Sequence, residues 1–184
     1  MGKHRRTAYR KATEALEAEG RKQCILLYSA TAIALNQHWN KGKQTILSLF
    51  EVSGDVFHGC AETNRYSMIE MCEKETGITV LNETGKSWED LPYLNGTLDE
   101  KPMSNAQWAY MRMQQKKWVA PQVMSGLMIA LHRKYGFGFD RCQRIYGQIR
   151  DIEEEYGMDP ERIREACRKK TGINIMEVIE KEKA

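Results

Sequence analysis

The sequence lacks the features that define several large classes of protein. Its five cysteines are an odd number and none stands in a Cys-x-x-Cys pair, which argues against a disulfide framework and a zinc knuckle. The longest apolar run, residues 24–35, is interrupted by Ser29 and Thr31 and is shorter than the ~20 residues that span a bilayer. No apolar stretch with a cleavage site closely follows the basic N-terminus, so we expect no secretory signal. A cytoplasmic protein without a membrane partner is the resulting expectation.

Motifs that carry catalysis are also missing. The stretch FHGCAE (57–62) has the Cys-Ala-Glu order of zinc deaminases, but no Pro-Cys-x-x-Cys completes such a site. Residues 99–101 (DEK) match the tail of metal-dependent nuclease patterns without the surrounding strands, and no glycine-rich nucleotide loop is present. Cys72 and Cys167 fall on apolar helical faces, where small core residues are expected rather than nucleophiles. We therefore expect no enzyme, no metal, no cofactor and no small-molecule substrate.

Charge is nearly balanced overall but unevenly distributed along the chain. The formal net charge is +3, yet residues 1–22 and 130–150 are basic whereas residues 51–75 are acidic. Basic patches on a nearly neutral protein favour a polyanionic partner. An ordinary solvated surface is the alternative interpretation.

An internal repeat is the strongest pattern that the sequence contains. Two stretches 96 positions apart share Ile-Ala-Leu, an aromatic residue and a glycine: IALNQHWNKGKQTILSLF (33–50) and IALHRKYGFGFDRCQRIY (129–146). After a slip of one residue, EMCEKETGITV (70–80) aligns with EACRKKTGINI (165–175). A fixed period with matching ends indicates a duplicated unit, with copies at about 9–80 and 104–175.

The repeat and the helical signals together predict a mainly α-helical chain. We expect two copies of a unit of about four helices, in an N-terminal repeat with a basic arm (1–81) and a C-terminal repeat (104–184), joined by an acidic linker (82–103) that packs on both. The β-branched tails after Gly77 and Gly172 predict short extended segments that could pair with each other. In the second copy, capping and periodicity predict four helices: from Ser104 toward Trp118, from Pro121 to Tyr135, over 139–155, and from Asp159 to Gly172.

The stretch KYGFGFDRCQR (134–144) is best explained as a corner between two helices. Gly136 and Gly138 lie between the predicted helices of the second copy, and Gly42 and Asn40 take their places in the first. Both residue types tolerate a left-handed backbone, so backbone geometry alone accounts for these glycines.

Basic residues near aromatic ones remain to be explained. A helix, a glycine turn and a second, basic helix is the layout of helix-turn-helix DNA readers, although any antiparallel helix pair with a glycine corner shares it. A solvated face or a protein-facing patch is therefore the alternative. The candidate nucleic-acid or partner contacts are Arg133, Lys134, Arg141, Arg144, Lys41 and Lys43 at the corners, with Lys3, Arg5 and Arg6 as a flexible second arm.

The Tyr-Gly-Phe-Gly stretch, the basic residues after it and the closing KKTGINI resemble small proteins carried by phages and mobile elements of Gram-positive gut bacteria. The size, the duplicated layout and the basic character resemble the type II anti-CRISPR proteins of such elements, which inhibit Cas9. This resemblance covers part of the second copy and, more weakly, the first. It implies a non-enzymatic protein of the bacterial host cytoplasm that binds a nucleic acid or a nucleoprotein complex, such as Cas9 with its guide RNA.

One departure from that resemblance changes the expected mode of action. Many Cas9 inhibitors are acidic mimics of DNA, whereas this chain is slightly basic, so it would bind nucleic acid or the nucleoprotein complex instead of imitating a duplex. Two other functions stay open: a helix-turn-helix-like DNA-binding regulator or recombination accessory, and a scaffold that binds acidic protein surfaces. The sequence also leaves the oligomeric state open, a homodimer included.

Overall fold

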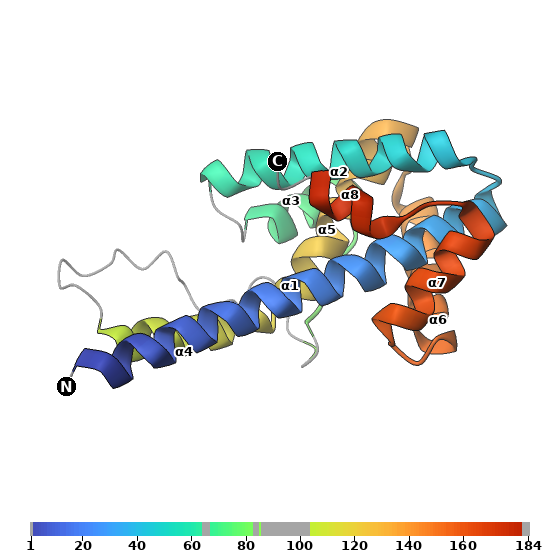
Figure 1. Cartoon of the computed structure of the whole chain (residues 1–184). Coiled ribbons are helices and arrows are strands. Elements are labelled where there is room, and N and C mark those ends of the chain that lie inside the picture. Colours follow the sequence, from blue (N-terminus) through green and yellow to red (C-terminus); the bar gives the residue numbers. More distant parts are fainter. Residues whose placement is uncertain (1, 64–66, 83–84, 86–103, 182–184) are drawn as a thin grey trace.

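Helices make up most of the part of the chain that the structure describes (Figure 1). A computed structural model describes residues 2–63, 67–82, 85 and 104–181, and in these residues no strand is present. The prediction of a mainly α-helical protein is confirmed. The helices are α1 (Gly2–Trp39), α2 (Lys43–Thr63), α3 (Ser67–Thr76), α4 (Asn105–Lys116), α5 (Val119–Tyr135), α6 (Phe139–Glu155), α7 (Pro160–Thr171) and α8 (Ile175–Lys181).

Local signals in the second copy begin and end α4, α6 and α7 close to where they were predicted, whereas α5 begins at Val119, two residues before the predicted start at Pro121. Before α4, the Ser104 backbone N–H donates to Gln107 Oε1 at 2.8 Å and the Gln107 N–H donates to Ser104 Oγ at 3.3 Å, which is the expected capping box. The Asp159 carboxylate caps α7 by accepting from the N–H groups of residues 161 and 162. Gly136 (φ 62°) and Gly172 (φ 70°) end α5 and α7 in the left-handed conformation.

The β-branched tails do not pair as strands in the described part of the chain. Residues 78–82 have no regular structure, and α8 begins at Ile175, within the second tail. Ile78 and Ile173 are buried in the core instead. The expectation of paired extended segments was therefore wrong, because these side chains are required for packing and not for a sheet. The predicted linker lies outside the described residues except for Asn82 and Gly85.

The first copy begins with one unbroken helix where the second has two. Helix α1 runs for 38 residues, whereas α4 ends at Lys116 and α5 begins at Val119. Trp118 lies between them and is buried. The N-terminal half of α1 packs along α4, and the two extend together from the rest of the molecule (Figure 1). No described helix is both long and apolar enough to cross a bilayer.

The two predicted copies exchange their packing partners. Helices α2 and α3 pack on α5 of the second copy, and α6 and α7 pack on α1 of the first copy. By contrast, α1 contacts α2 only sparsely, and α5 contacts α6 equally sparsely. All of these helices contribute to one hydrophobic core. The division into two repeats thus stays a prediction about the sequence, since the core does not separate them in space.

Matched ends of α3 and α7 are what a duplication would produce. Thr76 Oγ1 donates to the Cys72 carbonyl at 2.7 Å, and Thr171 Oγ1 donates to the Cys167 carbonyl at 2.8 Å. The same hydroxyls accept from the N–H two residues later, at 3.1 and 3.2 Å. Burial raises the pKa of both thiols to about 11, so they stay protonated at neutral pH. The duplication itself stays a hypothesis that these shared caps support.

Glu153 on α6 is a buried carboxyl at the position that aligns with Phe57 of the first copy. It is 2% exposed, borders a cavity of about 760 Å³, and its carboxylate lies 3.3 Å from Arg150 Nη1. Burial raises its pKa above the ordinary value, although Arg150 opposes the shift. The native state therefore holds this proton to a higher pH than the unfolded state, so Glu153 lowers stability as pH rises through that window.

We expect the substitution Glu153→Gln to remove this pH-dependent loss. The melting temperature of the variant, relative to the wild type, should rise between about pH 4 and about pH 7, because only the wild type must bury a negative charge at the higher pH. Thermal unfolding followed by circular dichroism at both pH values measures the difference. A difference that is the same at both pH values would show that Glu153 does not titrate with folding.

Candidate functional site

The two predicted corners meet at one end of the molecule. Tyr135, the last residue of α5, donates its hydroxyl to the Thr45 carbonyl in α2 at 2.7 Å. Trp39, the last residue of α1, donates its Nε1–H to Gln148 Oε1 in α6 at 2.8 Å. Each helix end thus bonds to the helix that follows the other corner, and neither corner is an independent unit.

Only one residue of each corner needs a left-handed backbone. These residues are Gly136 (φ 62°) and Asn40 (φ 50°), which align in the repeat. Gly138 has an extended backbone, Gly42 has no positive φ, and an added Cβ at either position would meet nothing within 4 Å. Backbone geometry therefore explains Gly136 and Asn40, but it does not require glycine at Gly42 or Gly138.

Three aromatic rings pack against one another between the two corners. The Phe137 ring lies 4.7 Å from the Trp39 ring and 5.7 Å from the Tyr135 ring, measured between centroids. Phe137 is only 3% exposed, while Trp39 and Tyr135 are half-buried. This cluster joins the corner of the first copy to that of the second.

Cations from both corners lie over these rings. Lys41 Nζ is 5.0 Å from the centre of the Tyr135 ring, and the Arg144 guanidinium is 5.9 Å from that of Trp39. The Arg141 guanidinium is likewise 5.9 Å from the centre of Phe137. At these distances the ring quadrupoles attract the cations. The rings therefore hold three of the predicted site residues in place without neutralising their charge.

The corner cations lack acidic partners. Among the described residues, no carboxylate lies within 4.0 Å of the charged groups of Lys41, Lys43, Arg141 or Arg144. Lys43, Arg141 and Arg144 are exposed and lie in the first turns of α2 and α6. Positive charge at a helix N-terminus is opposed by the helix dipole. Helix stability thus does not account for these cations.

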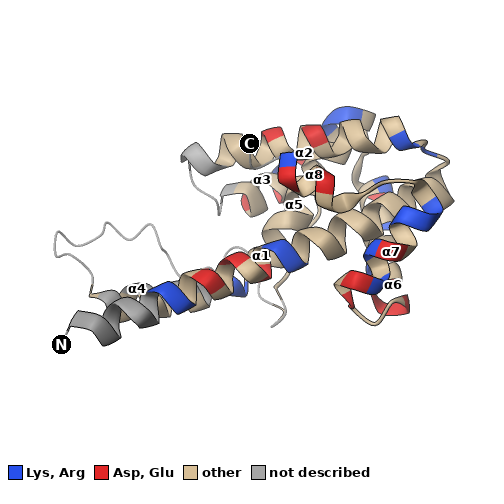
Figure 2. Ribbon diagram, in the orientation of Figure 1, with Lys and Arg blue, Asp and Glu red and all other residues tan. Residues whose placement is uncertain are grey.

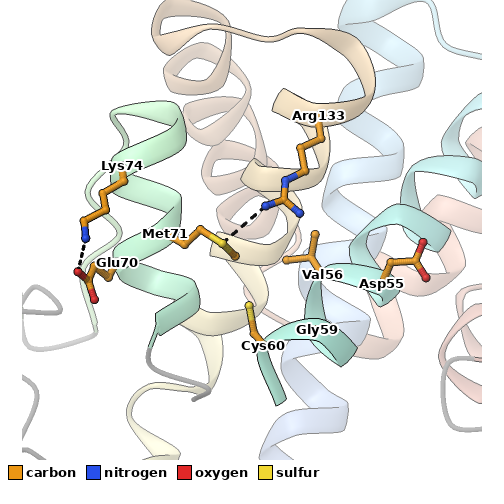
Figure 3. A pocket seen from close by; sticks show the side chains of 8 residues that line it. All are labelled: Asp55, Val56, Gly59, Cys60, Glu70, Met71, Lys74 and Arg133. Atoms are coloured by element: carbon orange, nitrogen blue, oxygen red, sulfur yellow. Dashed lines mark hydrogen bonds and ion pairs between the residues drawn. The ribbon is translucent and has the colours of Figure 1, made fainter. Parts of the chain in front are cut away.

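Arg133 is separated from this group by an ion pair. Its Nη2 lies 2.6 Å from Glu75 Oε1 in α3 and its Nε lies 3.1 Å from Oε2, which further raises the arginine pKa. Its Nη2 also approaches Met71 Sδ at 3.6 Å, so the guanidinium is directed toward α3 (Figure 3). Lys134 is half-buried beside it. Arg133 is therefore already engaged, unlike the four corner cations.

The cleft below Arg133 is lined by side chains of both charges and favours no single class of ligand. It has a volume of about 450 Å³ and contains both acidic and basic side chains, among them Asp55, Glu70 and Lys74, with Cys60 at its base (Figure 3). Lys74 Nζ and Glu70 Oε1 pair at 2.5 Å. In the described part of the chain, no cluster of three His, Cys, Asp or Glu side chains could hold a metal ion.

The predicted basic arm lies far from the corners. Lys3, Arg5 and Arg6 belong to the first turns of α1, so the backbone there is helical and not a flexible arm. At a rise of 1.5 Å per residue, Arg6 is roughly 50 Å along the helix from Trp39. Their side chains lie outside the described part of the structure. The structure does not bring this arm and the corners together.

Sequence reasoning missed three cations at the end of α7. Arg168, Lys169 and Lys170 are exposed in its last turn, and a Cβ added to Gly172 would lie 4.0 Å from Lys43 Cδ. The charge map shows basic residues where α2 begins and where α7 ends (Figure 2). The repeat alignment could have identified these cations, because it places Arg-Lys-Lys (168–170) over Glu-Lys-Glu (73–75) within otherwise similar stretches.

The comparison with known proteins gives no relative from which a function could be transferred. No known family, no curated protein and no solved structure matches the chain.

Proposed function

We propose that the paired corners bind the phosphate backbone of a nucleic acid, and that the protein acts by binding and not by catalysis. The observation that carries the proposal is the group of four cations, Lys41, Lys43, Arg141 and Arg144, without carboxylate partners in the described structure. Such cations can contact phosphates without first breaking an ion pair, and each contact releases condensed counterions. Cation–π contacts order three of them before the partner arrives, which lowers the entropic cost of binding.

The three aromatic rings at the corners have no open face for stacking, which favours a duplex over a single strand as the ligand. Proteins that bind single strands stack bases on open aromatic faces. Here Phe137 is buried, and Lys41 and Arg144 lie over the faces of Tyr135 and Trp39. The corner therefore offers charge without a stacking platform, which suits the backbone of paired strands.

The resemblance to type II anti-CRISPR proteins makes the target more specific. We propose an assembly of Cas9 with its guide RNA, in which the corner would contact the backbone of bound nucleic acid. A cationic surface supports this mode because it cannot imitate a DNA duplex.

A DNA-binding regulator is the second candidate, and the position of α6 favours it. Helix α6 begins at the corner and exposes Arg141 and Arg144 in its first two turns, as the N-terminal residues of a recognition helix do.

Changing Arg141 and Arg144 together to alanine tests the proposal. Each phosphate contact contributes roughly −0.9 to the slope of log affinity against log salt on duplex DNA, so the slope should flatten by about two units. The free energy of unfolding should fall by at most about 1–2 kcal/mol, because both side chains are exposed and each loses one cation–π contact. Fluorescence anisotropy of a labelled duplex at several salt concentrations measures the slope.

The matched control removes the same charge elsewhere. Lys11 and Lys22 are exposed on α1, and changing both to alanine should leave the slope unchanged. A full slope in the Arg141→Ala, Arg144→Ala variant would show that the corner is not the binding site. In a Cas9 cleavage reaction, wild-type protein should inhibit and this variant should not. If the wild type binds duplex but does not inhibit, the second candidate replaces the first.

A further inference from the structure

The ends of α3 and α7 occupy equivalent places but carry opposite charge. Helix α3 packs on α5 and α7 packs on α1, so each packs on a helix of the other copy, and each ends in a threonine cap and a left-handed glycine, Gly77 or Gly172. At the aligned positions of the last turn, α3 has Glu73, Lys74 and Glu75, whereas α7 has Arg168, Lys169 and Lys170. Two sites that the fold makes alike therefore differ in their chemistry.

Each glycine lies against the first residue of a helix at the corners. A Cβ on Gly77 would lie 3.0 Å from the Phe139 ring at the start of α6, and one on Gly172 would lie 4.0 Å from Lys43 at the start of α2. The two helix ends thus flank the paired corners on either side. The α3 side presents the half-exposed ring of Phe139 and the Arg133–Glu75 ion pair, whereas the α7 side presents Lys43.

The cations on the α7 side are not neutralised within the described structure. No described carboxylate lies within 4.0 Å of the charged groups of Arg168, Lys169, Lys170 or Lys43, although Arg164 earlier in α7 pairs with Glu161. Lys170 Nζ instead lies 5.6 Å from the centre of the Tyr156 ring.

A purely structural role does not account for this group. The helix dipole favours cations in the last turn of α7, but it opposes Lys43 at the start of α2. Lys43 also lies beside the C-cap of α7, whose dipole offsets that of α2, so the dipoles together do not account for Lys43, which adds to the like charge of Arg168, Lys169 and Lys170. A polyanion that contacts both would relieve the repulsion.

We propose that the nucleic-acid surface extends from the corners across Lys43 onto the last turn of α7, and that it does not extend onto α3. This inference rests on the proposed function and gives the binding surface a direction. A duplex would cross one side of the corners only, because on the other side the cations Arg133 and Lys74 are already paired with Glu75 and Glu70, and Glu73 adds negative charge. The diverged charges of two equivalent helix ends are what determine that direction.

The test compares two variants that lose the same charge. The first variant replaces Arg168, Lys169 and Lys170 with glutamine. The second, the control, replaces Lys11, Lys22 and Lys74 with glutamine. Lys74 is the aligned counterpart of Lys169. The salt slope on a labelled duplex should flatten by up to roughly three units in the α7 variant, at about −0.9 for each of the three cations, and stay unchanged in the second.

Lys43→Gln separates binding from folding. It should flatten the slope by roughly one unit, yet it should change the melting temperature little, because the dipole of α2 opposes this charge whereas that of α7 favours it. A lower melting temperature with an unchanged slope would show that Lys43 has a structural role and would overturn its place on the surface.

The other outcomes are equally distinct. If the α7 variant keeps the full slope while Arg141→Ala, Arg144→Ala loses it, the extension is wrong and the proposed function stands. If both keep the full slope, both proposals fall. Equal losses in the α7 variant and its control would mean a net-charge effect and would also overturn the extension. Binding of polyglutamate that needs the α7 cations, without an effect on duplex binding, would assign this side to an acidic protein surface instead.

Discussion

Replacing Arg141 and Arg144 with glutamate is expected to abolish binding to duplex DNA. The change removes two unpaired cations and places two carboxylates against the phosphates. Like charges at an interface cost several kcal/mol, and each ~1.4 kcal/mol is a factor of ten, so affinity should fall at least about a hundredfold. Anisotropy at low salt measures the loss.

The fold should tolerate this charge reversal. Both positions are exposed in the first turns of α6, where the helix dipole favours negative charge, so the far-ultraviolet circular dichroism should match the wild type. The control carries glutamate at Lys11 and Lys22, which changes the net charge equally. Comparable losses in the two variants would show that net charge and not the corner determines binding. Full affinity in the first variant would exclude the corner altogether.

Phe50→Ala is expected to cause the largest loss of stability. Phe50 in α2 is 1% exposed and its ring stacks on that of Tyr28 in α1, with centroids 4.6 Å apart and planes within 2°. Truncating a buried phenylalanine typically costs about 3–5 kcal/mol, because transfer energy is lost and a cavity remains. Domains of this kind have a total stability of about 5–15 kcal/mol, so the variant should unfold at much lower urea concentration.

Tyr146 is the matched comparison, because it aligns with Phe50 in the repeat. It lies in α6, is half-buried and borders the cavity beside Glu153, so Tyr146→Ala should cost clearly less. Urea unfolding followed by circular dichroism measures both free energies. Equal losses would show that the two copies contribute equally to the core, contrary to the burial of these two rings.

The sequence by itself determined the local structure of this protein. The Ser104 capping box, the Asp159–Pro160 start and the glycines after Tyr135 and Thr171 predicted where helices begin and end, and the structure agrees at each. These signals are reliable because hydrogen bonds and backbone angles at a helix end depend on residues within one turn. The aligned stretches likewise predicted equivalent corners at Asn40 and Gly136.

Only the tertiary structure decided how these elements come together. No local pattern shows that the helices after each corner pack on the helix before the other corner, because that choice depends on the burial of apolar faces along the whole chain. The same packing joins the two corners into one cationic surface, brings Lys43 beside the end of α7, and pairs Arg133 with Glu75 in α3. The sequence indicates which side chains are charged. Whether a cation can bind a partner or is already paired depends on its distance from the nearest opposite charge, and that distance is defined only in the folded chain.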